Sequence, residues 1–174
     1  RTPLMPSILS RREVLQQATT LIAGAAVKAR RLEARQASPP ATRFFPGFKS
    51  FKIDAAGAVI NGVIGGQGPP ILLLHGAPQT HVVWHSVAPQ LAANYTVVAT
   101  DLRGYGDSSK PPDGDNHANY SKRATGNDQV QVMRYFGFNR FALIGADRGA
   151  RVAHRMAMDH ADNISSLVLI DIIP

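Results

Sequence analysis

The sequence predicts an α/β fold with a mainly parallel sheet flanked by helices. Short apolar runs that suit buried strands alternate along the chain with segments of helical periodicity, an order that indicates βαβ units. The clearest transition runs from the apolar residues 141–146, through a turn rich in small residues, into the amphipathic residues 148–160. A chain of 174 residues with 44% hydrophobic composition can enclose one core, and we expect that core in residues 44–174.

The expected strands follow from two patterns. Residues 44–54 and 58–64 are β-rich runs on either side of Gly57, which predicts an antiparallel hairpin leading into the sheet. Mostly apolar runs, typical of strands buried on both faces, follow at residues 71–74, 95–100, 141–146 and 167–170.

Three helices are expected between these strands, at residues 86–93, 121–136 and 148–160. The second has apolar residues spaced by three and is stopped by Gly137, although Gly126 weakens it by roughly 1 kcal/mol relative to alanine. The third buries a stripe made of Val152, Ala153, Met156 and Ala157. Residues 101–115, rich in Gly, Pro and Asp, are expected to form a loop.

Residues 1–37 differ from the rest in charge and are expected to be a leader. Residues 1–52 hold 10 Lys and Arg against 2 Asp and Glu, a balance of +8, whereas residues 53–174 hold 9 against 10, a balance of −1. The segment SRREVLQ at residues 10–16 resembles a twin-arginine export motif, and the apolar stretch after it is too short to span a bilayer. If the leader functions, the protein is exported to the periplasm or secreted. Otherwise the segment is a frayed basic helix and the protein is cytoplasmic.

Residues 38–43 are expected to be a linker, because they begin with Ser38, Pro39 and Pro40.

The folded part after the linker is nearly neutral, so we expect no nucleic-acid groove and no stable membrane insertion. The chain has no cysteine, which excludes a disulfide or a thiolate site.

The stretch Gly145-Ala146-Asp147-Arg148-Gly149 predicts a nucleophile elbow, a tight strand-to-helix turn that lifts one side chain above a parallel sheet. Small residues two before and two after the central position let the backbone turn without a clash. The usual nucleophile of such a turn is serine, but here it is Asp147. A carboxylate in this position attacks carbon, displaces a leaving group and forms an ester, which water then hydrolyses.

That chemistry needs a donor pair, a hold on the substrate, a base and an acid that orients the base. The Ala77 N–H follows a buried strand and is expected to form an oxyanion hole with the Arg148 N–H. Arg148 and Arg151 lie three apart on one helix face, and we expect them to bind an anionic substrate. The alternative is that one of them only pairs with Asp147 or a surface acid. Asp171 ends an apolar strand and is the candidate acid, unless it only caps the next turn.

No candidate for the base follows Asp171, although the histidine comes after the acid in this kind of fold. All the histidines precede Asp171, and they are His75 in the oxyanion turn, His81, His85, His117, His154 and His160. His81 and His85 have i, i+4 spacing without a third ligand, so no metal site is expected, and no cofactor is expected either. We therefore expect the sequence to be truncated at its C-terminus.

Five segments of the chain carry a joint resemblance to a known family, namely HGAPQTHVVWH (75–85), DLRGYGDSSKP (101–111), NYSKR (119–123), GADRGARVAHRMAMDH (145–160) and LIDIIP (169–174). Together they resemble the α/β-hydrolase superfamily, and within it the fluoroacetate (haloacetate) dehalogenase branch, near the soluble epoxide hydrolases. The resemblance implies the N-terminal part of an α/β-hydrolase core, with the cap, the last strands and the catalytic histidine beyond Pro174. It also implies that Asp147 is the nucleophile, that Arg148 and Arg151 bind the substrate carboxylate, and that Asp171 is the triad acid.

The leading expectation is therefore a hydrolase that cleaves the carbon–halogen bond of short haloacids, such as haloacetate, through an ester on Asp147. Its expected partner is a small anionic substrate, with a homodimer as a candidate assembly. One alternative is a soluble epoxide hydrolase, which uses the same nucleophile. Another is an inactive fragment or a carboxylate-binding module that lacks the catalytic histidine. An ordinary esterase is not expected, because no serine occupies the turn.

Overall fold

The structure, a computed structural model, describes residues 44–55 and 57–172. The expected leader at 1–37 and linker at 38–43 lie outside the described residues. The strands are β1 (Lys49–Ala55), β2 (Ala58–Gly65), β3 (Pro70–Leu74), β4 (Thr96–Thr100), β5 (Phe141–Ala146) and β6 (Ile164–Ile170). The helices are α2 (Ala88–Leu91), α3 (Lys122–Tyr135) and α4 (Arg148–Asp159), with short 3₁₀ helices η1 (His81–Ser86), η2 (Asp115–Tyr120) and η3 (Ala161–Asn163).

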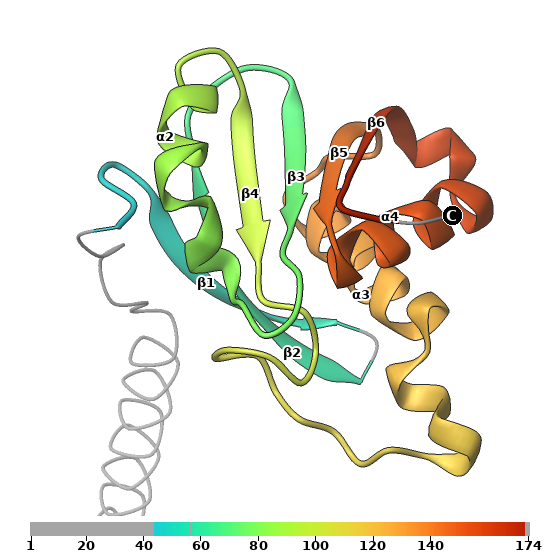
Figure 1. The fold of residues 1–174 in the computed structure, drawn as a ribbon. Coiled ribbons are helices and arrows are strands. Elements are labelled where there is room, and N and C mark those ends of the chain that lie inside the picture. Colours follow the sequence, from blue (N-terminus) through green and yellow to red (C-terminus); the bar gives the residue numbers. More distant parts are fainter. Residues whose placement is uncertain (1–43, 56, 173–174) are drawn as a thin grey trace, which may run out of the picture. The chain divides into compact units, whose positions relative to one another are not determined.

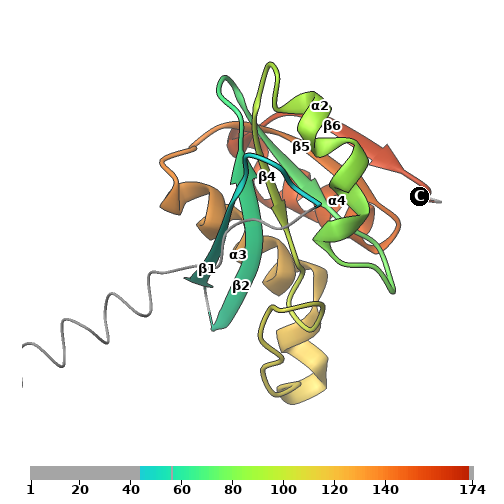
Figure 2. The same ribbon diagram turned by 90° about the vertical axis from the view of Figure 1, so that its left-hand side faces the viewer.

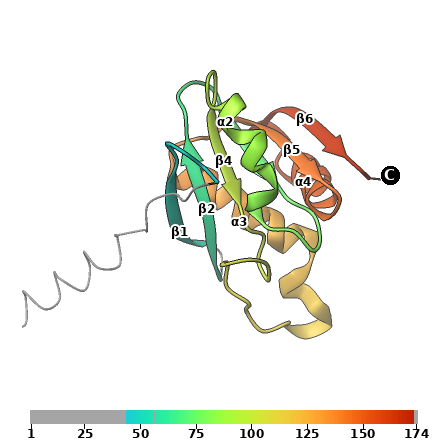
Figure 3. The same ribbon diagram turned by 60° about the vertical axis from the view of Figure 1, so that its left-hand side comes forward.

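The described strands form one mixed sheet in the order β1-β2-β4-β3-β5-β6 (Figure 1). Strand β2 pairs antiparallel with both β1 and β4, whereas β4, β3, β5 and β6 run parallel to one another. Figure 3 shows β1 and β6 at opposite ends of this sheet. The topology confirms the predicted α/β fold with its N-terminal hairpin and mainly parallel sheet.

Helices cover both faces of the sheet, with α2 on one side and α3 and α4 on the other (Figures 1 and 2). Leu72 and Leu74 of β3 pack into a core cluster with residues of α3 and α4. The alternate residues, Ile71 and Leu73, pack into a second cluster with Trp84 of η1. Successive side chains of a strand point to opposite faces, so β3 is buried on both sides, as its apolar run predicts.

Two strand boundaries differ from the prediction. The first strand begins at Lys49, because residues 44–48 form a turn that buries the rings of Phe45 and Phe48 instead of extending the hairpin. The last strand begins at Ile164, earlier than the predicted residue 167, because Ile164 already pairs with Phe141 of β5. In both places tertiary contacts, and not local apolar runs, set the end of the strand.

The helix predicted at residues 86–93 is wrong in its extent. The chain turns helical earlier, in η1, where the Thr80 hydroxyl accepts a hydrogen bond from the Val82 N–H and caps the first turn. Within residues 86–93 the α-helical part is α2 alone. Pro89 lies in its first turn, a position that tolerates a missing N–H.

Helix α3 has the ends that its sequence predicts. The Ser121 side chain accepts a hydrogen bond of 3.1 Å from the Ala124 N–H at the start. At the other end Gly137 adopts a φ of 81°, and the Phe138 N–H donates to the Met133 carbonyl at 2.9 Å, which is a Schellman ending. In the described part of the chain, no helix is long and apolar enough to cross a membrane.

Candidate active site

The carboxyl ends of the parallel strands gather several polar residues. Asp101 follows β4, His75 follows β3, Asp147 follows β5 and Asp171 follows β6. Strand β5 lies between β3 and β6 in the parallel part of the sheet, so the loops after these three strands begin side by side. This edge is where open parallel sheets usually carry their sites.

Asp147 occupies the turn between β5 and α4 in a rare backbone conformation. Its φ of 46° and ψ of −113° lie in a region that costs a non-glycine residue about 1–3 kcal/mol. Its carbonyl accepts hydrogen bonds from the Ala150 and Arg151 N–H groups, which start the helix. Gly149 lies against the loop after β3, since a Cβ there would come within 2.5 Å of the Leu74 carbonyl oxygen. The small residue predicted two positions after Asp147 is thus required by close backbone contact.

One oxygen of the Asp147 carboxylate is held by the loop after β3. The Ala77 N–H donates a hydrogen bond of 2.8 Å to Oδ2. This bond, followed by one from the Arg148 N–H, lowers the pKa of Asp147 from its ordinary value; burial opposes them, and the charges of Arg151 and Arg148 lower the pKa further. The two N–H groups expected to form an oxyanion hole therefore converge on an ionised carboxylate. Their action on a reaction intermediate stays a prediction.

Arg148 and Arg151 lie in the first turn of α4, and both residues are exposed. The Arg148 Cζ lies 6.0 Å from the centroid of the Tyr105 ring, which is within cation–π range. Among the residues that the structure describes, neither arginine takes part in an ion pair. The alternative in which one of them pairs with Asp147 or a surface acid is not observed, and both guanidinium groups remain available for an anion.

Asp171 comes to the same sheet edge as Asp147. The Asp147 N–H donates a hydrogen bond of 2.9 Å to the Ile170 carbonyl, so the backbone just before Asp171 adjoins the turn that carries Asp147. Asp171 itself is exposed and has a φ of 55°. Its role as the acid that orients a base stays a prediction.

His75 is buried and joins two loops. Its Nε2 accepts a hydrogen bond of 3.0 Å from the Leu102 N–H, while Nδ1 lies 2.7 Å from the Gly76 carbonyl, to which it donates. Burial lowers the pKa of His75, and the bond to Gly76 only partly opposes this. Because both ring nitrogens are engaged, the neutral imidazole links the loop after β3 to the Leu102 backbone and has no nitrogen free to act as a base.

The carboxylate of Asp101 is the centre of a buried network that the sequence reasoning missed. It accepts hydrogen bonds from the His81 backbone N–H (2.7 Å), from His81 Nδ1 (2.8 Å) and from Asn61 Nδ2 (2.9 Å). Burial raises the pKa of Asp101, but the bonds and charge of His81 and the N–H of Asp107 outweigh it and hold the pKa at about 2. Asp101 ends an apolar strand just as Asp171 does, and that signal could have identified it.

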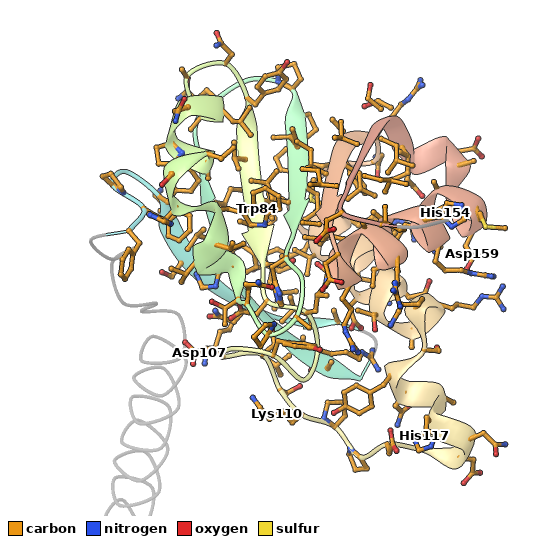
Figure 4. The ribbon with its side chains drawn as sticks, viewed as in Figure 1. Trp84, Asp107, Lys110, His117, His154 and Asp159 are labelled. Carbon is orange, nitrogen blue, oxygen red and sulfur yellow. The ribbon has the colours of Figure 1, made fainter. Side chains whose placement is uncertain are left out.

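The other histidines have separate surroundings. His154 is exposed on α4 and His117 lies in η2 (Figure 4). His160 Nε2 lies 2.8 Å from Asn127 Oδ1, and His85 Nδ1 lies 3.1 Å from a backbone carbonyl of its own 3₁₀ helix. Within residues 44–55 and 57–172, no group of three His, Cys, Asp or Glu side chains could hold a metal ion.

Comparison with known proteins identifies the family of this site. The family model described as the alpha/beta hydrolase fold matches residues 69–174. The chain therefore belongs to the alpha/beta hydrolase family, as the motifs in its sequence predict.

Two curated relatives and one solved structure show which members of the family this chain is similar to. The chain is 55% identical over 130 residues to a fluoroacetate dehalogenase from Burkholderia sp., a match that covers 75% of this chain and 43% of the relative. It is 40% identical over 122 residues to a soluble epoxide hydrolase from Corynebacterium sp. (strain C12), covering 67% and 41%. Among solved structures, ALR0039 from Nostoc sp. PCC 7120 is 57% identical, with a TM-score of 0.72, and the match covers 73% of this chain and 44% of that one. The chain thus spans less than half the length of these relatives.

Proposed function

We propose that the whole protein is a hydrolase that displaces halide from short 2-haloacids by attack of Asp147. One observation carries the proposal: an ionised carboxylate, held through Oδ2 by the Ala77 N–H, lies beside Arg148 and Arg151, whose charges act on it. The carboxylate supplies a nucleophile, and the two guanidinium groups supply a hold for a carboxylate at the other end of a short substrate. The similarity to a fluoroacetate dehalogenase supports the same substrate class.

In the first step, the Oδ1 of Asp147 attacks the carbon that bears the halogen. A carbon–oxygen bond forms, the carbon–halogen bond breaks, and the halide leaves with the bonding electron pair. Because Oδ2 accepts the Ala77 hydrogen bond, Oδ1 is the oxygen free to attack, and Oδ2 becomes the carbonyl oxygen of the new ester. The turn between β5 and α4 acts here as a nucleophile elbow.

In the second step, water adds to the ester carbonyl carbon of Asp147 and gives up a proton to a base. Negative charge develops on Oδ2, where the N–H groups of Ala77 and Arg148 stabilise it; one such donor is typically worth about 2.7–4 kcal/mol. Collapse of this intermediate releases the 2-hydroxyacid and restores the Asp147 carboxylate. In the proposal Asp171 orients the base, which is the histidine that the resemblance implies beyond Pro174.

An epoxide hydrolase is the second candidate, favoured by the 40% identity to the Corynebacterium enzyme. It uses the same attack by Asp147 but has no need for cationic anchors, since its substrate carries no charge. A third candidate is a protein that binds carboxylates without turnover. Parallel assays of the whole protein with fluoroacetate, chloroacetate and styrene oxide distinguish the three candidate functions. Halide release from the haloacids supports the proposal; diol formation alone, or binding of the acids without release, contradicts it.

We also propose that the segment at residues 10–16 directs export, because it resembles a twin-arginine motif. A reporter fused to residues 1–43 and expressed in a bacterium tests this. Export that is lost when Arg11 and Arg12 are both replaced by lysine supports the proposal, and retention of the intact fusion in the cytoplasm contradicts it.

A further inference from the structure

Tyr105 adjoins the site, although the proposed reaction gives it no role. It lies in the loop after β4, is half-buried and packs against the core cluster beneath that loop. The centroid of its ring is 6.0 Å from the Arg148 Cζ. It is also 5.3 Å from the centroid of the His75 ring, in an edge-to-face contact at 69°. Tyr105 is therefore next to both the loop after β3 and the first turn of α4.

The backbone of the loop after β4 fixes the position of Tyr105. The Tyr105 N–H donates a hydrogen bond of 2.9 Å to the Leu102 carbonyl. The residues on either side, Gly104 and Gly106, have φ angles of 84° and 48°, which side chains other than hydrogen rarely allow. A Cβ at Gly104 would also come within 2.8 Å of the Tyr120 ring. The two glycines thus give the loop the sharp course that presents Tyr105.

The His75 ring, which contacts Tyr105, is itself held rigidly. His75 is fully buried, and its Nε2 accepts a hydrogen bond of 3.0 Å from the Leu102 N–H. The same residue, Leu102, therefore binds His75 through its N–H and Tyr105 through its carbonyl. Because both rings are tied to one point of the backbone, we expect the Tyr105 ring to keep its place when a ligand binds.

The Arg148 side chain, by contrast, has little else to orient it. The residue is exposed, and among the described residues it forms no ion pair. An exposed arginine loses side-chain entropy when it binds an anion. A guanidinium group next to an aromatic face is attracted by the ring while its N–H donors stay free for a carboxylate. Within the described part of the chain, no such ring lies over Arg151, so the two arginines differ.

We propose that Tyr105 is a positioning residue whose ring holds the Arg148 guanidinium in the orientation that receives the substrate carboxylate. The inference rests on the proposed function for its substrate class. The binding of an anion at Arg148 does not need turnover, however, so the positioning role and the reaction can be tested separately.

Binding of acetate, an unreactive analogue, to the whole protein tests the role of the ring by titration calorimetry at neutral pH. We expect Tyr105→Leu to weaken acetate binding about 5-fold, and Tyr105→Phe, which keeps the ring, to change it by less than about twofold, as suits a partly exposed cation–π contact. If Tyr105→Leu does not fold, Tyr105→Met fills more of the same space and takes its place. The matched control is Tyr135→Leu, which removes the same side chain from an exposed position on α3 and leaves acetate binding unaffected.

A double-mutant cycle with Arg148→Gln separates positioning from a general packing role. In the Arg148→Gln protein, Tyr105→Leu is expected to weaken acetate binding by less than about twofold, because the ring acts only through the guanidinium group. Turnover gives a second readout: Tyr105→Leu raises KM for chloroacetate about 5-fold and leaves kcat unchanged, since the contact is the same in the ground state and the transition state.

Three results would each overturn the inference: native acetate affinity in Tyr105→Leu, an equal loss in Tyr105→Phe, or an undiminished effect of Tyr105→Leu in the Arg148→Gln protein. If no haloacid releases halide but acetate still binds through Arg148 and the Tyr105 ring, the proposed reaction fails and the positioning role stands. If chloroacetate is turned over with the same KM in Tyr105→Leu as in the native protein, the positioning role fails and the reaction stands.

Discussion

The Ala77 N–H donates a 2.8 Å hydrogen bond to Oδ2 of Asp147, joining the loop after β3 to the turn after β5. The bond fixes which carboxylate oxygen is held and which is free. It also contributes most to the low pKa of Asp147, which keeps the group ionised at neutral pH. The proposed reaction depends on this single contact between residues 70 positions apart in the chain.

Replacing Arg151 by alanine is expected to lower kcat/KM for chloroacetate by about 10- to 100-fold, because a hydrogen bond to a charged group contributes roughly 1.5–3 kcal/mol. Halide release over a range of substrate concentrations measures it. Arg123→Ala is the matched control. Because Arg123 pairs with Asp159, this variant is expected to leave turnover unchanged. Unaltered haloacid kinetics in Arg151→Ala, or an equal loss with styrene oxide, would contradict a role in anion binding.

Gly149→Ala is expected to lower the free energy of unfolding by about 1–3 kcal/mol or more, because its Cβ would lie 2.5 Å from backbone carbonyl oxygens that cannot move aside. Gly126→Ala is the comparison. Its Cβ would lie 2.8 Å from Met156 Cγ, a side-chain atom that can shift more easily than backbone, and alanine gains about 1 kcal/mol over glycine within a helix. Urea unfolding of both variants checks the difference, and equal destabilisation would show that the Gly149 contact is unimportant.

Arg103 and Asp128 form a buried ion pair with bonds of 2.6 Å (Nε to Oδ2) and 2.5 Å (Nη2 to Oδ1). Burial raises the pKa of Asp128, and Arg103 opposes this. Arg103→Met leaves that carboxyl group buried without its partner and is expected to cost about 3–5 kcal/mol of stability, whereas the double variant with Asp128→Leu recovers much of the loss. Thermal unfolding measures both, and a double variant no more stable than the single one would contradict this account.

The low pKa of Asp101 predicts a specific acid sensitivity. The pKa of Asp101 in the folded state is about 2, below its ordinary value of 3.8. The stability that the ionised Asp101 contributes is therefore fully present above pH 3.8 and is lost as the pH falls through about 2. The shift corresponds to about 2 kcal/mol. Unfolding free energies measured between pH 5 and pH 2, a range chosen to bracket roughly both pKa values, should fall less steeply in Asp101→Asn than in the native protein. Parallel slopes would mean that His81 does not stabilise the ionised form.

The fold could be predicted where the signal is local. Apolar runs and glycine stops gave the strands β3 to β5 and helix α3, and the small residues around Asp147 gave the turn. Boundaries set by distant partners could not be predicted: Phe45 and Phe48 belong to the core through their burial, and Ile164 belongs to β6 through its pairing with β5.

The residues of the candidate site also divide into those with a local sequence signal and those whose role depends on distant partners. Asp147, Arg148, Arg151 and Asp171 come from one turn and one strand end, where spacing alone is informative. Asp101 was missed because the partners of its carboxylate, His81 and Asn61, come from other parts of the chain.

The most direct test of the central claim follows the oxygen of water. When the whole protein turns over chloroacetate in water enriched in oxygen-18, hydrolysis of the ester at the Asp147 carbonyl carbon must leave the label in that carboxylate. We predict heavy oxygen in the peptide that contains Asp147 after many turnovers, and none when the haloacid is omitted. Sustained halide release with an unlabelled Asp147 would show that water attacks the substrate directly, and it would contradict the proposed nucleophile.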